Sequence, residues 1–231
     1  MATSLITKAK QTFIDDSLVP VVQEMMRIFP DGLVITSGLY ALLTLSFPFG
    51  VFFSSMLEAT AAFHFIRWGV SYLNISPISV SSKSYTHICR TGFTQPTTSL
   101  LSMSMFASEA IPNPVPSAPI YILSVASAYI FSTLNLQSKE LAALGPAYSS
   151  RYYVSAIFLT ILIFLFVSFR IAFGCDSLGT IIMSVPIGLM IGALLVQQNT
   201  RLFGAESVNL VGIPLLQGRT ATGKKIYVCP K

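Results

Sequence analysis

Few residues in this chain have types and spacing that could do chemistry, and the clearest set is a near match to a phosphate-binding loop. Gly218, Gly223 and Lys224 reproduce the spacing of that loop, in which backbone N–H groups hold phosphate oxygens. The motif also needs Ser or Thr after the lysine to hold magnesium, and a helix beyond it. Lys225 stands in place of the hydroxyl residue, and the six residues after it are too few for the helix. We therefore do not expect nucleotide binding.

His87 and Cys89 form the one close pair of soft metal ligands. Structural zinc sites use four ligands, commonly arranged as two pairs. The remaining cysteines, Cys175 and Cys229, are distant in sequence, so we expect no metal site. Three widely spaced cysteines do not make a disulfide framework, although one bridge between two of them stays open.

Glu58, His64 and Arg67 interrupt an apolar segment and suggest a proton relay, because ionisable groups at membrane depth are functional candidates. On a regular helix, however, His64 and Arg67 point about 240° and 180° away from Glu58. We expect them at the membrane interface. Asn74 begins a glycosylation triplet that is followed by Pro77, and we do not expect its use. No catalytic triad, Cys-His pair or carboxylate pair can be assigned, so neither an enzyme nor a cofactor is expected.

The composition indicates an integral membrane protein. Of 231 residues, 53% are hydrophobic and 10% are charged, whereas soluble domains carry about 25% charged residues. Such a composition excludes intrinsic disorder, and a chain this small cannot hide so much apolar area from water. The net charge of +5 is scattered without runs of like charge, so nucleic acid is not an expected partner. A small-molecule substrate is not expected either.

The predicted fold class is an all-α polytopic membrane protein with about four transmembrane helices. Residues 1–31 read as an amphipathic helix, which lies either in the membrane interface or against the rest of the chain. Residues 32–70 read as one span kinked at Pro48 with an extension, the alternative being a second helix after a break. Residues 71–118 form a Ser/Thr/Pro-rich connection outside the membrane.

Residues 119–196 hold three further predicted spans, at 119–136, 152–169 and 177–196. Each is uncharged and reaches about 27–30 Å, enough to cross a bilayer. Gly188 and Gly192 lie on the last of them, where small residues allow close helix packing.

The polar tail, residues 197–231, contains two short β-prone runs that predict a hairpin. An exposed strand edge can pair with the sheet of a partner protein. The expected partner-binding residues are Val211, Ile213, Leu215, Ile226 and Val228.

Four spans place both termini on one side of the membrane. That side then carries ten of the 14 Lys and Arg residues, and the positive-inside rule favours cytosolic termini. No secretory signal peptide is expected, because no long apolar run precedes Asp15 and Asp16.

Three stretches of the chain resemble multispan virion membrane proteins of nucleocytoplasmic large DNA viruses, especially the chlorovirus-like group. They are residues 46–59, residues 89–93 and residues 209–230, and none is an enzymatic signature. The resemblance implies a minor capsid protein seated in the virion membrane beneath an icosahedral shell, with no catalytic residue.

We therefore expect a structural protein that ties a capsid to the bilayer through its loops and tail. Its expected partners are the lipid bilayer and other capsid or complex proteins. One alternative is an accessory subunit of a large energy-converting membrane complex. A channel or transporter is less favoured, because the later spans hold no charged residue.

Overall fold

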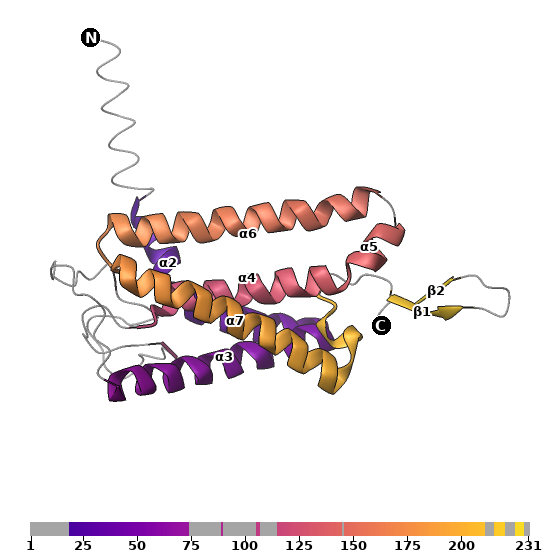
Figure 1. The fold of residues 1–231 in the computed structure, drawn as a ribbon, viewed down its shortest axis with the longest axis horizontal. Helices are drawn as coiled ribbons and strands as arrows, with labels where there is room; N and C mark the ends of the chain where they lie inside the picture. Colours follow the sequence, from indigo (N-terminus) through magenta and orange to yellow (C-terminus); the bar gives the residue numbers. More distant parts are fainter. Residues whose placement is uncertain are drawn as a thin grey trace, which may run out of the picture.

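Long helices dominate the computed structural model, which describes residues 19–73, 89, 105–106, 115–144, 146–210, 215–219 and 225–228. Figure 1 shows α3, α4, α6 and α7 running roughly along the long axis, with the strands β1 and β2 beyond one end. The element order along the chain is α2, α3, α4, α5, α6, α7, the 3-10 helix η3, β1 and β2.

The first apolar region forms two helices instead of the single kinked helix that we predicted. Helix α2 (Val19–Thr44) ends one residue before Leu45, whose φ of 50° turns the chain back. Helix α3 (Phe47–Tyr72) then begins with Pro48 in its first turn and the extended Ser46 as its N-cap. Proline is tolerated there because the N–H that it lacks would have no partner within the helix. Pro48 therefore starts a helix and kinks none.

Helix α2 also corrects the boundary predicted at residue 31. Residues 19–31 are not a separate amphipathic helix, because α2 runs through them without a break. This segment also contacts the helix formed by Pro146–Ala172, since the ring centroids of Phe29 and Phe166 lie 5.0 Å apart. Residues 1–18 lie outside the described residues.

Helix α4 (Ala118–Leu136) matches the predicted span at 119–136 closely. The short helix α5 (Ser138–Leu144) follows it and was not predicted. Helix α6 (Pro146–Ala172) is a long apolar helix whose surface is largely exposed, in contrast to α4, which is mostly buried. Figure 1 shows α6 at the top of the bundle, above α4 and α7.

Helix α7 (Leu178–Phe203) continues for about two turns past the end of the predicted span at 177–196. Residues 197–203, which we had assigned to the polar tail, are therefore helical. The 3-10 helix η3 (Ala205–Val208) follows, with Val208 completely buried. The strands β1 (Leu215–Arg219) and β2 (Lys225–Val228) pair in antiparallel fashion, with Leu215 opposite Val228.

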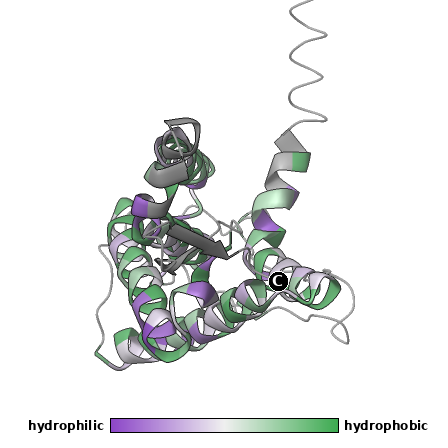
Figure 2. Ribbon diagram, turned by 90° about the vertical axis from the view of Figure 1, so that its right-hand side faces the viewer, coloured by the Kyte–Doolittle hydropathy of each residue, from purple (hydrophilic) through white to green (hydrophobic). Residues whose placement is uncertain are grey.

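In the described part of the chain, five helices are long and apolar enough to cross a membrane, one more than the sequence predicts. They are α2 from Glu24, α3, α4, α6 from Tyr152, and α7. Large apolar side chains also point outward, including Leu43 (84% exposed) and Phe164 (68% exposed). Figure 2 shows that hydrophobic residues predominate along the helix ribbons. Such a surface is compatible with an integral membrane protein.

The core lies where α4 packs against α7, α3 and α2. Tyr121, Tyr129 and Phe63 are its largest fully buried side chains. The Phe52 ring packs edge to face against Tyr129, with ring centroids 5.1 Å apart. The Phe63 ring packs at a tilt against Tyr121, with centroids 5.6 Å apart. Helix α4 is therefore the central element that the other helices surround.

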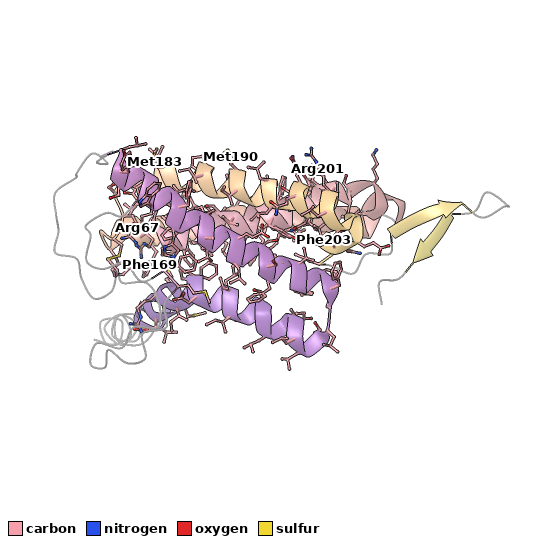
Figure 3. The ribbon with its side chains drawn as sticks, turned by 90° about the horizontal axis from the view of Figure 1, so that it is seen from below. Arg67, Phe169, Met183, Met190, Arg201 and Phe203 are labelled. Atoms are coloured by element: carbon pink, nitrogen blue, oxygen red, sulfur yellow. A yellow bond between two sulfur atoms is a disulfide. The ribbon has the colours of Figure 1, made fainter. Side chains whose placement is uncertain are left out.

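The bundle has two ends, and the loops divide between them. The disulfide end comprises residues 64–73, 105–106, 115–118 and 170–178, and the tail end comprises residues 44–47, 136–144, 146 and 203–210. Figure 3 shows Arg67 and Phe169 towards the first end and Arg201 and Phe203 towards the second. An odd number of long helices separates the start of α2 from the end of α7, so these points lie at opposite ends.

Candidate functional site

Buried polar side chains from three helices meet around Asn199 of α7. Its side-chain nitrogen donates hydrogen bonds to Ser55 Oγ of α3 at 2.7 Å and to Tyr129 OH of α4 at 3.2 Å. The Asn199 carbonyl oxygen also accepts a hydrogen bond from Ser207 Oγ of η3 at 3.2 Å. All four residues are buried. We call Ser55, Tyr129, Asn199 and Ser207 the asparagine cluster.

Glu58 lies one turn along α3 from Ser55, at the outer rim of the asparagine cluster. Its Oε2 atom accepts a hydrogen bond from Gln198 Nε2 of α7 at 2.9 Å, and this bond is exposed. Between residues 47 and 63 of α3 it is the one charged side chain, and residues 118–136, 152–169 and 177–200 hold none. This carboxylate, in the middle of α3, therefore accepts its hydrogen bond from a neutral amide.

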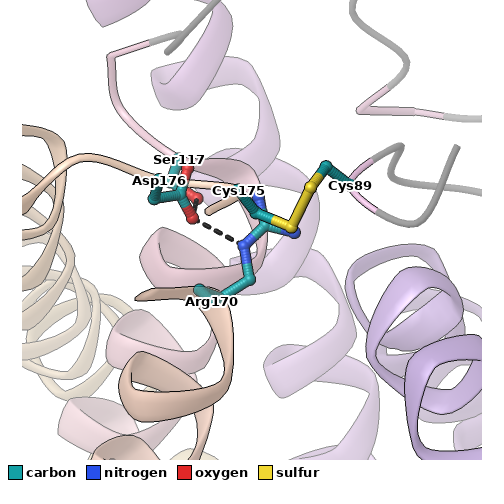
Figure 4. Close-up of a disulfide and its surroundings, with 5 residues drawn as sticks. All are labelled: Cys89, Ser117, Arg170, Cys175 and Asp176. Carbon is teal, nitrogen blue, oxygen red and sulfur yellow. Dashed lines mark hydrogen bonds and ion pairs between the residues drawn. A yellow bond between two sulfur atoms is a disulfide. The ribbon is translucent and has the colours of Figure 1, made fainter. Parts of the chain in front are cut away.

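A second polar group closes the disulfide end, around Asp176. Asp176 Oδ2 accepts hydrogen bonds from Arg170 Nε at 2.6 Å and from Ser117 Oγ at 2.8 Å. Both side chains of this ion pair are almost completely buried. Figure 4 shows the pair beside the disulfide between Cys89 and Cys175. The ion pair thus joins the end of α6, the start of α7 and the start of α4.

The turn between α6 and α7 explains how the Asp176 group forms. Gly174 has a φ of 66°, a conformation that glycine adopts without steric cost, and it ends α6. The Cys175 N–H then donates to the Arg170 carbonyl oxygen at 2.9 Å. Ser177 caps α7 by accepting from the Thr180 N–H at 3.2 Å. This tight reversal brings Arg170 and Asp176 together.

The connection between α3 and α4 is also held at the disulfide end. The Met105 N–H donates to Asp31 Oδ1 of α2 at 2.9 Å, and the Met105 carbonyl oxygen lies 2.8 Å from His64 Nε2 of α3. The neighbouring Phe106 is completely buried against the core. His64 therefore acts as a hydrogen-bond partner of the connection, which the sequence did not predict.

Gly188 and Gly192 lie at the contact of α7 with α4. A Cβ atom on Gly188 would come within 2.7 Å of the Tyr121 carbonyl oxygen, and one on Gly192 within 2.3 Å of the Val125 carbonyl oxygen. No real Cβ atom makes contacts this short, so the two helices approach each other only because these positions lack side chains.

The other predicted residues are spread over the chain. Arg67 lies near the C-terminal end of α3, and Cys89 is in the disulfide. Leu215, Ile226 and Val228 belong to the paired strands. Outside the described residues lie Asn74, His87, Val211, Ile213, Cys229 and the loop that contains Gly223 and Lys224.

Sequence reasoning missed the asparagine cluster and the Asp176 group. Asn199 was placed in the tail because Gln197, Gln198 and Asn199 form a polar run after an apolar span. A usable signal was its spacing of seven and eleven residues from Gly192 and Gly188, which places all three on one helix face. For Arg170 and Asp176, the signal was two opposite charges flanking a short turn.

The arrangement favours holding helices together over reacting with a ligand. Among the described residues, no group of three or more His, Cys, Asp or Glu side chains could hold a metal ion. The described part of the chain has an open groove of about 820 Å³ along α2 and α3, and its lining is mainly apolar. A second hollow of about 370 Å³ lies between α4, α6 and α7.

Comparison of the chain with protein families, curated proteins and solved structures finds no match.

Proposed function

We propose that this chain is a structural integral membrane protein that anchors a protein assembly to the bilayer through its loops and tail. The observation that carries the proposal is the use of the buried polar side chains. In the asparagine cluster and around Asp176, they bond to neighbouring helices of the same chain. A hydrogen bond between helices in an apolar surrounding stabilises their packing. Polar groups used in this way support a rigid anchor.

The tail supports the second half of the proposal. The strands β1 and β2 form a two-stranded sheet beyond the tail end of the bundle. A sheet of two strands has two edges with unpaired backbone groups, and an isolated hairpin is only marginally stable in water. Pairing of one edge with the sheet of a partner protein would satisfy those groups. We assign the partner-binding role to this hairpin.

The resemblance to virion membrane proteins extends the proposal to a particular assembly. On that basis the partner is a capsid protein, and the membrane lies beneath an icosahedral shell. Two of the resembling stretches correspond to the N-cap and first half of α3 and to the segment that contains the hairpin. The hairpin is thus both the resembling segment and the proposed docking element.

The test is deletion of residues 211–231, which removes the hairpin and leaves η3 in place. A cut at residue 205 would remove Ser207 and the fully buried Val208, and would damage the bundle itself. We expect the truncated chain to resist alkaline extraction from membranes but to be lost from purified particles, as measured by quantitative mass spectrometry. Unchanged incorporation would contradict the proposal.

A point substitution refines this test. Ile226→Pro removes a backbone N–H from β2 and should reduce incorporation as the deletion does. Thr222→Pro, in the loop between the strands, is the matched control and should be incorporated normally. Co-purification of the native chain with respiratory or photosynthetic subunits would instead favour an accessory subunit.

A further inference from the structure

We infer that the disulfide end of the bundle faces an oxidising compartment and the tail end faces the cytosol. The orientation follows from the Cys89–Cys175 disulfide, because such bonds persist in extracellular and luminal compartments and are rare in the cytosol. This inference goes beyond the structural role proposed above, since an anchor could have either orientation.

Formation of the bond requires both thiols to lie on the same side of the membrane. Helices α4 and α6 separate Cys89 from Cys175 in sequence, so two crossings return the chain to the starting side. The two thiols lose two protons and two electrons to the disulfide of a luminal oxidoreductase, which is reduced to its dithiol. The product is the Cys89–Cys175 bond, and the compartment supplies the oxidant.

The disulfide is part of a larger closure of that end. The connection between α3 and α4 is held at Met105 by Asp31 and His64, and at Ser117 by Asp176. Cys89 and Cys175 are themselves 2% and 3% exposed. Three separate contacts therefore hold this connection to one end of the bundle, and the disulfide lies among them.

The third cysteine lies one crossing away from the other two. Helix α7 separates Cys175 from Cys229, which follows β2 in the chain. Five crossings therefore place the bonded cysteines on one side and Cys229 on the other. This division matches a membrane with an oxidising compartment on one side and a reducing one on the other.

Charge does not decide the orientation once five helices cross. The four-span prediction placed ten of the 14 basic residues on one side, but five spans divide them seven and seven. One side holds Lys8, Lys10, Arg27, Arg67, Lys83, Arg90 and Arg170, and the other holds Lys139, Arg151, Arg201, Arg219, Lys224, Lys225 and Lys231. The positive-inside rule gives no preference for such a division. The cysteines are then the feature that distinguishes the two sides.

Glycosylation scanning of the full chain in cultured eukaryotic cells tests this orientation. Gly92→Asn creates an Asn-Phe-Thr acceptor in the connection between α3 and α4. Thr220→Asn creates an Asn-Ala-Thr acceptor in the tail and is the matched control. Both are made in an Asn74→Gln background, which removes the native triplet. We expect a glycosidase-sensitive gel shift for Gly92→Asn and none for Thr220→Asn.

Any other pattern overturns the inference. A shift for the tail site alone reverses the orientation, shifts for both sites contradict a single orientation, and a shift for neither contradicts a luminal connection. Because residues 211–231 are retained, these outcomes are independent of whether the hairpin binds a capsid protein.

Thiol counting tests the redox half of the inference on the same cells. The chain is denatured at harvest and treated with polyethylene-glycol maleimide, which adds one mass step for each thiol. We expect one step without reductant and three after reduction, and two steps without reductant for Cys175→Ser. Three steps from the native chain without reductant would show that both cysteines are thiols and would contradict the oxidising side.

Discussion

Asn199 shows how a single polar side chain can join several helices. The side-chain amide of Asn199 donates hydrogen bonds to Ser55 of α3 and Tyr129 of α4. The backbone oxygen of Asn199 accepts a hydrogen bond from Ser207 of η3. Neither the Ser55 hydroxyl nor the Tyr129 hydroxyl is reached by water, because both residues are buried. Loss of the amide would remove the donor to both buried oxygens, although Ser55 would keep its own hydrogen bond to the Val51 carbonyl oxygen. A buried acceptor that loses its donor costs free energy.

Substitution of Asn199 by Leu tests this role at nearly constant volume. We expect the free energy of unfolding to fall by about 1 kcal/mol, since hydrogen bonds between membrane helices contribute about 0.6–1.7 kcal/mol. The measurement is reversible unfolding in mixed detergent micelles. Asn135→Leu is the control, because Asn135 is exposed on α4. Equal effects of the two substitutions would contradict the role.

At the scale of elements, the closest packing in the bundle is between α4 and α7. Gly188 and Gly192 lie one turn apart on α7, against the backbone of α4 at Tyr121 and Val125. Ser184 continues this face, since its hydroxyl accepts from the Ser117 N–H at 2.8 Å. Small residues at intervals of four allow helix backbones to approach within an apolar solvent. This contact explains why α4 is buried although α6 covers it only partly.

Gly192→Ala should weaken the α4–α7 contact. Its Cβ atom would lie 2.3 Å from the Val125 carbonyl oxygen, so the helices must separate. Overpacking of this kind costs about 1–3 kcal/mol. Gly69→Ala on α3 is the matched control, because no atom lies within 4 Å of its added Cβ. The same unfolding measurement should show a loss for Gly192→Ala only, and a comparable loss for Gly69→Ala would refute the packing argument.

For the molecule as a whole, the disulfide links two halves of the bundle. Cys89 lies between α3 and α4, and Cys175 lies between α6 and α7, 86 residues further along the chain. The bond therefore closes a loop that contains α4, α5 and α6. Together with the Arg170–Asp176 pair, it holds both halves of the chain at the same end.

A protease site inserted at residue 145, between α5 and α6, tests this linkage. After cleavage, the two halves should migrate as one band on a non-reducing denaturing gel and as two bands after reduction. With Cys175→Ser, the halves should separate without reductant. Two bands from the cleaved parent protein without reductant would disprove the linkage.

Much of the helical layout could be predicted from hydropathy. The span at 119–136 and helix α4 (Ala118–Leu136) differ by one residue, because Pro119 and the polar residues after Leu136 mark its ends. The break at Leu45 was missed, because Pro48 in a continuous apolar run reads equally well as a kink or as a helix start. The positive φ of Leu45 decides between them, and no residue preference indicates it.

The sequence by itself determined that the chain consists of long apolar helices, because helix length and hydropathy are local properties of each segment. Only the tertiary structure decided that Asn199 meets Ser55 and Tyr129, that Asp176 pairs with Arg170, and that Cys89 bonds to Cys175. These pairings depend on which helix faces turn towards each other. In a chain that is apolar on every side, hydropathy does not distinguish the inward face from the outward one.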